Sequence, residues 1–269
     1  MVRMLVHAGF HKTGTTSVQR MLAHNKRLLG REAHIVLRKH IMSICENARA
    51  FSASRDKLDL LAFTYELSDF LDRYKDGPDK HICISSEDLI GHMPGRRKLT
   101  TYDAAPILMK AFVHTVERVM PEPPEMIFYF STREASSWLT SCHTQHLRAV
   151  RMTMTTQEYI DAYADSARLD RIVDMVKIAV KPHRVETAPL ERLTKMPLGP
   201  LTPILDLLDI SPGIRRKLKP LPPANVSVSE DLRNEFLRIN QSDLDYDKMR
   251  QAKRAARTRW ENDLQSQDG

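Results

Sequence analysis

Short apolar runs alternate with longer stretches of helical periodicity along most of this 269-residue chain. Runs of about five apolar residues are typical of buried strands, whereas apolar residues three or four apart indicate helices. Strands that alternate with helices build a parallel sheet covered by helices on both faces. The order therefore predicts an α/β fold. The expected strands are residues 4–8, 34–37, 81–85, 126–130 and 183–187, and the expected helices are 14–29, 56–74, 104–120, 135–148, 156–180, 229–240 and 243–264.

We expect residues 1–210 to form one α/β domain. Residues 211–269 are expected to add a basic loop and C-terminal helices that pack on the same domain. Residues 212–223 suggest this boundary, because prolines and basic side chains replace the apolar periodicity there. The last helix combines a basic face with an apolar stripe, which is typical of a packed amphipathic helix with a solvated face. Alternatively, the last helix forms a lid over the nucleotide, pairs with a partner helix, or binds anionic lipid headgroups or nucleic acid.

Positive charge exceeds negative charge, with 41 Lys and Arg against 34 Asp and Glu and a formal net charge of +7. The excess favours an anionic partner without choosing among nucleotides, sulfated or phosphorylated substrates, nucleic acid and membranes. Aromatic residues make up only 6% of the chain and no nucleic-acid module is recognisable, so nucleic acid is not expected. The composition leaves the oligomeric state open.

The sequence predicts a cytoplasmic protein. Its three cysteines, Cys45, Cys83 and Cys142, are an odd and scattered set. That set suits neither a disulfide framework nor a four-ligand zinc site, so we expect buried thiols in a reducing compartment. No apolar run reaches the ~18–20 residues of a membrane span. Residues 1–7 also lack the long apolar core of a signal peptide.

A loop at residues 9–17, Gly-Phe-His-Lys-Thr-Gly-Thr-Thr-Ser, joins the first expected strand to the first expected helix. A parallel sheet binds phosphate at this place, because loop N–H groups and the helix N-terminus both face the anion. The two glycines keep the G-x-x-x-x-G spacing of a nucleoside triphosphatase, in which lysine directly follows the second glycine. Here Thr15 occupies that position and Lys12 lies two residues before Gly14. The displaced lysine disfavours an ordinary ATPase.

At these residues the sequence resembles the sulfotransferase superfamily, whose 5′-phosphosulfate loop commonly reads K-T-G-T-T/S. The resemblance implies a P-loop-type three-layer domain. It implies transfer of the sulfuryl group of 3′-phosphoadenosine 5′-phosphosulfate (PAPS) to a hydroxyl or amine, with release of 3′,5′-ADP. Lys12 would be catalytic, binding the 5′-phosphate and neutralising charge on the bridging oxygen. The cofactor-binding residues implied in the loop are His11, Lys12, Thr13, Gly14, Thr15, Thr16 and Ser17.

A second part of the resemblance follows the expected strand 126–130. Superfamily members carry an Arg at a strand end and a Ser eight residues later, both on the 3′-phosphate, and Arg133 and Ser141 fit that spacing. An arginine there can bind an anion through two hydrogen bonds. The next two residues depart from the family's usual Asp or Asn followed by Pro, which changes the turn. Residues 215–219 either cover the 3′-phosphate, as in some members, or form a solvated basic turn.

Sulfuryl transfer to a hydroxyl benefits from a general base. Glu87 follows the expected strand 81–85, at the carboxyl end where such sheets bind ligands, and is our candidate for the catalytic base. A salt bridge of Glu87, or a helix cap by a neighbouring residue, is the alternative. Four histidines are rival bases. Two of them lie three residues apart, but no carboxylate or cysteine completes a set of metal ligands, and no metal is expected. The rivals are His7, His11, His143 and His146.

The acceptor is expected to be a small molecule or a carbohydrate that lies against residues 140–163, where family members place variable helices. Basic residues in 148–152 would favour an anionic acceptor, or they form a solvated helix end. Two other functions stay open. One is a P-loop kinase-like nucleotide phosphotransferase, in which Glu87 or Asp88 would serve Mg²⁺. The other is a non-catalytic nucleotide-binding protein.

Overall fold

The structure, a computed structural model, describes residues 2–221 and 228–267. The chain divides into two compact units. The first comprises Met1–Glu134 and Asp165–Ala224, and the second comprises Ala135–Ala164 and Asn225–Gly269. The boundary that we expect after residue 210 falls inside the first unit. Residues 222 and 223, the end of the expected linker, lie outside the described residues.

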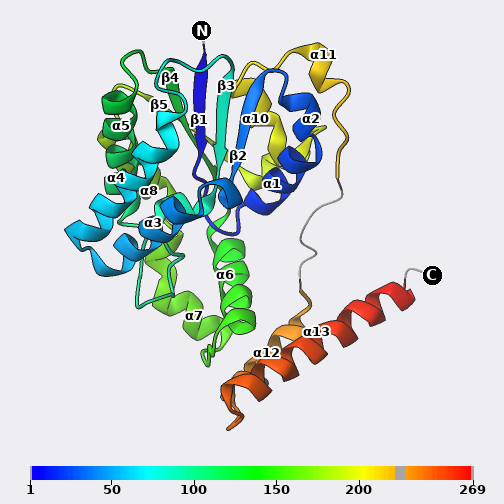
Figure 1. Cartoon of the computed structure of the whole chain (residues 1–269). Helices are drawn as coiled ribbons and strands as arrows, with labels where there is room; N and C mark the ends of the chain where they lie inside the picture. Colours follow the sequence, from blue (N-terminus) through cyan, green and yellow to red (C-terminus); the bar gives the residue numbers. More distant parts are fainter. Residues whose placement is uncertain (1, 222–227, 268–269) are drawn as a thin grey trace. The chain divides into compact units, whose positions relative to one another are not determined.

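The first unit contains a five-stranded sheet in the order β2-β3-β1-β4-β5, with every neighbouring pair parallel (Figure 1). The predicted α/β fold with a parallel sheet is therefore confirmed. β1 lies between β3 and β4, with β2 and β3 on one side of it and β4 and β5 on the other, so the chain changes sides once, between β3 and β4. In such sheets the crevice for a ligand opens at the carboxyl ends of these central strands. The strands are β1 (Arg3–His7), β2 (Ala33–Leu37), β3 (His81–Ser85), β4 (Glu125–Thr132) and β5 (Arg184–Pro189).

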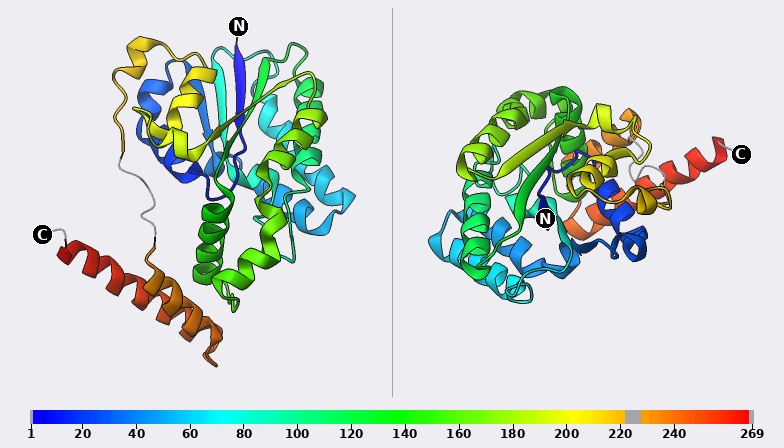
Figure 2. Two further views of the ribbon diagram at one scale, coloured as in Figure 1. Left: turned by 180° about the vertical axis from the view of Figure 1, so that it is seen from behind. Right: turned by 90° about the horizontal axis from the view of Figure 1, so that it is seen from above.

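Helices cover both faces of this sheet, which gives the expected three layers (Figures 1 and 2). Alternate strand residues point to opposite faces. Leu5 and Ile127 therefore join Val18 and Ile204 in one buried cluster, whereas Val6 is buried on the other face. One face carries α1 (Thr15–His24), α2 (Lys26–Leu29) and α10 (Thr202–Leu207); the other carries α3 (Met42–Ser54), α4 (Lys57–Asp72), α5 (Ala105–Val119) and α8 (Leu169–Ala179).

The structure corrects three helix predictions. The expected helix 14–29 is two helices, because the Asn25 side chain between them bonds both backbone groups of Lys219. The expected helix 156–180 is also broken, into α7 (Thr156–Tyr163), a 3-10 turn at Ala164–Ala167 and α8. The sequence does not predict helix α3, because its serine, glutamate, asparagine and arginine residues interrupt the apolar pattern.

The second unit is helical and contains α6 (Ala135–Ala149), α7, α12 (Glu230–Gln241) and α13 (Tyr246–Gln267). Leu147, Leu232, Phe236 and Ala256 form its apolar cluster, which confirms the amphipathic character of the last helix. Lys253 departs from the expected solvated face. Its ammonium is buried and donates to the carbonyl of Val150 over 2.8 Å, and burial together with the charge of Arg151 lowers its pKa to about 8.

The three cysteines are buried and form no disulfide. Burial raises the pKa of the Cys45 and Cys83 thiols to about 12, so neither is a reactive thiolate at neutral pH. Among the described residues, no helix has the length and apolar content needed to cross a membrane.

Candidate active site

The loop of residues 9–17 leaves the central strand β1 and enters α1. Gly14 is the residue before the helix, with φ +93°, and a Cβ there would lie 2.8 Å from Cδ1 of Leu190. Lys12 also has a left-handed backbone, with φ +67°. A non-glycine residue in this region costs of order 1–3 kcal/mol, and such strain gathers where a loop is shaped around a ligand. Both the glycine and the lysine thus shape the turn.

Backbone N–H groups at the start of α1 are available to an anion. The first N–H groups of a helix have no partner within the helix. Those of residues 13–16 donate to no acceptor in the part of the chain that the structure describes. The first turn contains no acidic residue, and no side chain caps it. The positive end of the helix dipole adds to these donors, so the loop has the properties of a phosphate site.

The hydroxyl of Thr13 has a structural role. Thr13 is fully buried, and its Oγ1 donates to the carbonyl of Phe10 over 2.6 Å. Oγ1 of Thr13 also lies 2.8 Å from Oγ of Ser131 in β4, which must then be the donor. These bonds tie the loop to its neighbouring strand. Of the Thr13 groups, the backbone N–H is the one left for an anion.

We expect Thr13→Val to destabilise the fold by about 1–3 kcal/mol, because it leaves the carbonyl of Phe10 and the hydroxyl of Ser131 without their buried partner. Thr16 is exposed in the same loop and supplies the matched control. Thr16→Val should change stability by no more than about 0.5 kcal/mol. Urea unfolding of both variants measures the difference, and equal losses would contradict the structural role of Thr13.

Arg133 lies at the loop, as the sequence predicts for a strand-end arginine. It follows β4, and its Nη1 donates to the carbonyl of Lys12 over 3.2 Å. The turn after it is held by the carboxylate of Glu191, which accepts from the N–H of Glu134 over 3.0 Å. Ser141 lies on α6 in the second unit. The 3′-phosphate roles of Arg133 and Ser141 stay predictions.

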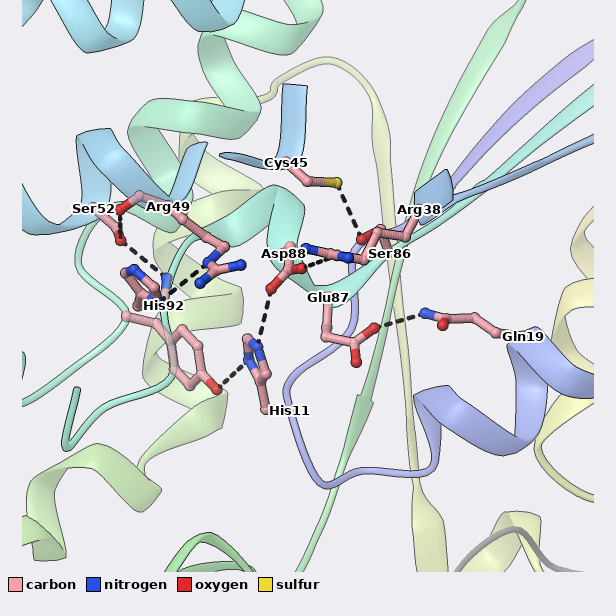
Figure 3. A network of polar contacts seen from close by, with 11 residues as sticks. His11, Gln19, Arg38, Cys45, Arg49, Ser52, Ser86, Glu87, Asp88 and His92 are labelled. Atoms are coloured by element: carbon pink, nitrogen blue, oxygen red, sulfur yellow. Dashed lines mark hydrogen bonds and ion pairs between the residues drawn. The ribbon is translucent and has the colours of Figure 1, made fainter. Parts of the chain in front are cut away.

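Glu87 lies directly beyond the end of β3, at the first position of the 3-10 helix η2 (Glu87–Ile90). Its Oε2 accepts from the Nε2 of Gln19 in α1 over 2.6 Å (Figure 3). Neither Ser86 nor Asp88 caps the helix with its side chain, and the partner of Glu87 is an amide rather than a lysine. Across the described ranges 2–221 and 228–267, the structure therefore contains neither a side-chain cap on this helix nor a salt bridge of Glu87. The role of Glu87 as the base stays a prediction.

A network of polar side chains anchors the loop next to Lys12 (Figure 3). The Nε2 of His11 lies 3.5 Å from Oδ1 of Asp88, and its Nδ1 lies 3.1 Å from the hydroxyl of Tyr102. Nε of Arg38 donates to Oδ2 of Asp88 over 2.5 Å. Because both nitrogens of the His11 ring face partners from other elements, this network fixes the ring. Its geometry favours a role for His11 in shaping the loop rather than as a base.

Asp88 is the charged centre of this network. Burial alone would raise its pKa, but hydrogen bonds and charge from His11 and Arg38 outweigh burial and lower the pKa to about 2. A carboxyl with a depressed folded-state pKa stabilises the fold above its unfolded pKa, and this contribution is lost as the pH falls toward the folded value. The contribution of Asp88 is therefore complete near neutral pH and declines in acid.

We expect Asp88→Asn to lower the free energy of unfolding by about 2–3 kcal/mol at neutral pH, from a depression of about two pKa units. The deficit should shrink between about pH 5 and about pH 2, where the wild-type carboxyl loses its advantage. Denaturant unfolding across this range measures it. Asp76→Asn, at an exposed aspartate, is the control and should show no such trend. A deficit that is constant with pH would contradict the assignment.

Three of the rival histidines have structural partners. His7 is fully buried, its Nδ1 lies 2.8 Å from Oγ of Ser85, and burial lowers its pKa to about 4 despite the opposing charge of Glu87. In the second unit, His143 Nε2 lies 2.9 Å from the carbonyl of Met154 and His146 Nδ1 lies 3.0 Å from the Tyr159 hydroxyl. These contacts favour packing roles for all three.

Arg215 holds the chain after α10. Its Nε and Nη2 donate to the carbonyls of Ile210 and Leu205, each over 2.6 Å, and Nη1 pairs with Asp206. The carbonyls at the end of a short helix attract this cation. The 3′-phosphate role suggested for residues 215–219 stays a prediction.

The sequence missed Arg38, Tyr102 and Gln19, which complete the surroundings of the loop. They come from three separate elements, so no local spacing connects them. Asp88 could have been predicted, because two consecutive carboxylates follow soon after a buried strand. A buried strand that ends in paired acids is a signal that charged partners lie near.

Comparisons with known proteins assign no family. No family model matches the chain, and no curated protein matches it. Among solved structures, a sulfotransferase from Alicyclobacillus acidocaldarius is 14% identical, with a TM-score of 0.44 over 89% of this chain and 92% of that chain. EHV4-TK complexed with TP5A is 11% identical, with a TM-score of 0.30 over 77% of this chain and 89% of that chain. Likeness this distant assigns neither activity nor ligand.

Proposed function

We propose that this chain is a sulfotransferase that moves the sulfuryl group of PAPS to a hydroxyl or amine of a small-molecule or carbohydrate acceptor in the cytoplasm. The observation that carries the proposal is the placement of Lys12. The lysine precedes the second loop glycine, as in the sulfotransferase loop, and its left-handed backbone lies at the end of β1. Thr15 occupies the lysine position of a nucleoside triphosphatase.

The residues at the loop fit an anionic nucleotide. Open N–H groups at residues 13–16 and the positive end of α1 would hold the 5′-phosphate oxygens, together with the Lys12 ammonium. Arg133, whose guanidinium contacts the loop backbone, would hold the second phosphate. PAPS supplies an activated sulfuryl group, and the chain's own part is to bind, orient and stabilise charge.

Glu87 would take the proton of the acceptor hydroxyl while the acceptor oxygen forms its bond to sulfur. Lys12 would neutralise the charge on the phosphate oxygen as the bond from that oxygen to sulfur breaks. The products are the sulfated acceptor, a protonated Glu87 and 3′,5′-ADP, so atoms and charges balance. Water then removes the proton from Glu87.

A P-loop kinase-like phosphotransferase is the second candidate for the same loop. It would need a carboxylate for Mg²⁺, and only Glu87 and Asp88 follow β3. Asp88 is already bound by Arg38 and faces His11. A phosphotransferase would therefore use Glu87 as its Mg²⁺ ligand. Such an enzyme would strictly require Mg²⁺, whereas a sulfotransferase would not.

The proposal is tested by label transfer from radiolabelled PAPS to acceptors in a crude metabolite extract, with EDTA present to remove Mg²⁺. We expect labelled product in wild type that is lost in Lys12→Ala. A non-catalytic nucleotide-binding protein would bind 3′,5′-ADP but transfer no label to any acceptor. A parallel assay with radiolabelled ATP and Mg²⁺, in place of PAPS and EDTA, tests the phosphotransferase, which would transfer labelled phosphate to the acceptors.

A further inference from the structure

A hollow lies in the first unit, separate from the loop site. Its volume is about 420 Å³, and it lies between α3 and the segment that follows η2. No part of residues 9–17 contributes to its lining. The lining residues are Glu46, Arg49, Ala50, Ala53, His92 and Arg97.

Positive charge dominates this hollow, with two arginines against one glutamate. Within residues 2–221 and 228–267, neither Arg49 nor Arg97 forms an ion pair. The Nε of Arg49 donates to Nδ1 of His92 over 3.3 Å, which leaves its two outer amino groups for a ligand. Burial and the charges of Arg49 and Arg96 lower the pKa of His92 to about 4, so this imidazole is neutral. Unpaired guanidiniums in a hollow favour an oxyanion.

The segment that carries Arg97 is held in a strained turn. Arg97 and Lys98 both have left-handed backbones, with φ of 51° and 63°. The turn is closed by bonds from the N–H of Gly95 to the carbonyl of Leu99 and from the N–H of Leu99 to the carbonyl of Arg96. Two consecutive strained residues that bring an arginine to the wall of a hollow are typical of a ligand clamp.

Two residues that line this hollow, Arg49 and His92, lie beside Asp88 in the network that anchors the phosphate loop (Figure 3). The charge of Arg49 acts on Asp88, which also faces His11, the residue before Lys12. The hollow lies on the β3 side of β1, because α3 packs on η2, whereas Arg133 follows β4 on the other side. A molecule in the hollow would thus lie on the side of the loop that carries His11 and Asp88, and away from the arginine expected to hold the nucleotide.

We propose that this hollow binds the acceptor, and that the acceptor is a hydroxylated compound with a carboxylate or sulfate group, such as an acidic sugar. Arg49 and Arg97 bind the oxyanion, and Glu46 accepts hydrogen bonds from hydroxyl groups of the same molecule. This inference rests on the proposed sulfotransferase activity. It names the class of acceptor that this activity uses.

The test compares D-glucuronate with D-glucose, a matched sugar without the acid, by ligand-detected NMR on the full chain with 3′,5′-ADP present. We expect glucuronate to bind and glucose not to bind. Arg49→Gln and Arg97→Gln should each weaken the binding of glucuronate by about tenfold, because each variant loses one charge-assisted contact. Arg27→Gln, in α2 on the opposite face of the sheet, is the control and should bind like wild type.

The affinity for 3′,5′-ADP is measured on the same variants and should stay within about twofold, because no residue of the hollow is in the loop. Glucose binding as well as glucuronate, or no loss in either variant, would overturn the acid-binding hollow. If both variants lose the binding of 3′,5′-ADP, the hollow belongs to the nucleotide site and the inference is overturned. A wild type that binds glucuronate but not 3′,5′-ADP would keep the hollow as an acid site and reject the proposed function.

Discussion

Lys12→Ala is expected to lower the rate of sulfuryl transfer by about 10²–10³-fold, the usual effect of removing one donor that stabilises developing charge. The variant should keep its fold. Lysine and alanine bear the same steric cost in a left-handed backbone, so the substitution removes the charge without altering the turn. Transfer of label from PAPS measures the rate, and thermal melting measures the fold.

Lys57→Ala is the matched control for this prediction. Lys57 is an exposed lysine at the start of α4, and its loss removes one positive charge from the same unit. The rate should not change in this variant, because the charge is remote from the loop. Full activity in Lys12→Ala would reject the assigned role, and so would an equal loss in the two variants.

Glu87→Gln is expected to lower turnover by about 10²–10⁴-fold, the range that general acid–base catalysis contributes. The amide keeps the shape of the side chain, and its oxygen can still accept from Gln19, so the loop should stay in place. Binding of 3′,5′-ADP should therefore remain within about twofold of wild type. Turnover and equilibrium binding are measured on the same preparation.

Gln19→Leu separates the carboxylate from its hydrogen-bond partner. It removes the contact of 2.6 Å but leaves the base in place, so its loss of turnover should be smaller than that of Glu87→Gln. If Glu87→Gln loses the binding of 3′,5′-ADP but keeps its turnover, the carboxylate supports the loop and the base lies elsewhere. Unchanged turnover in Glu87→Gln would reject the role directly.

The parallel sheet could be predicted because its signal is local. Strands β1 to β4 each contain a short apolar run, and the expected strand at residues 81–85 matches β3 residue for residue, whereas β5 is largely polar. The loop is also local, since glycine spacing, lysine and helix start lie within nine residues. Both the strands and the loop could therefore be predicted without knowing which distant residues pack against them.

The anchoring network could not be predicted, because its members are far apart in the sequence. His11, Arg38, Asp88 and Tyr102 come from four segments that the sheet order brings to one edge. The same limit applies to Arg215, which the sequence places in a basic segment and whose guanidinium binds carbonyls at the end of a helix. A side chain's partner is set by tertiary packing, which no local pattern records.

The central claim is that the loop with the displaced lysine binds a sulfotransferase nucleotide. Calorimetry of wild type with 3′,5′-ADP, and separately with ATP and Mg²⁺, tests it most directly. We predict micromolar binding of 3′,5′-ADP without any metal and much weaker binding of ATP with Mg²⁺. Micromolar binding of ATP with Mg²⁺ and no binding of the bisphosphate would contradict the account.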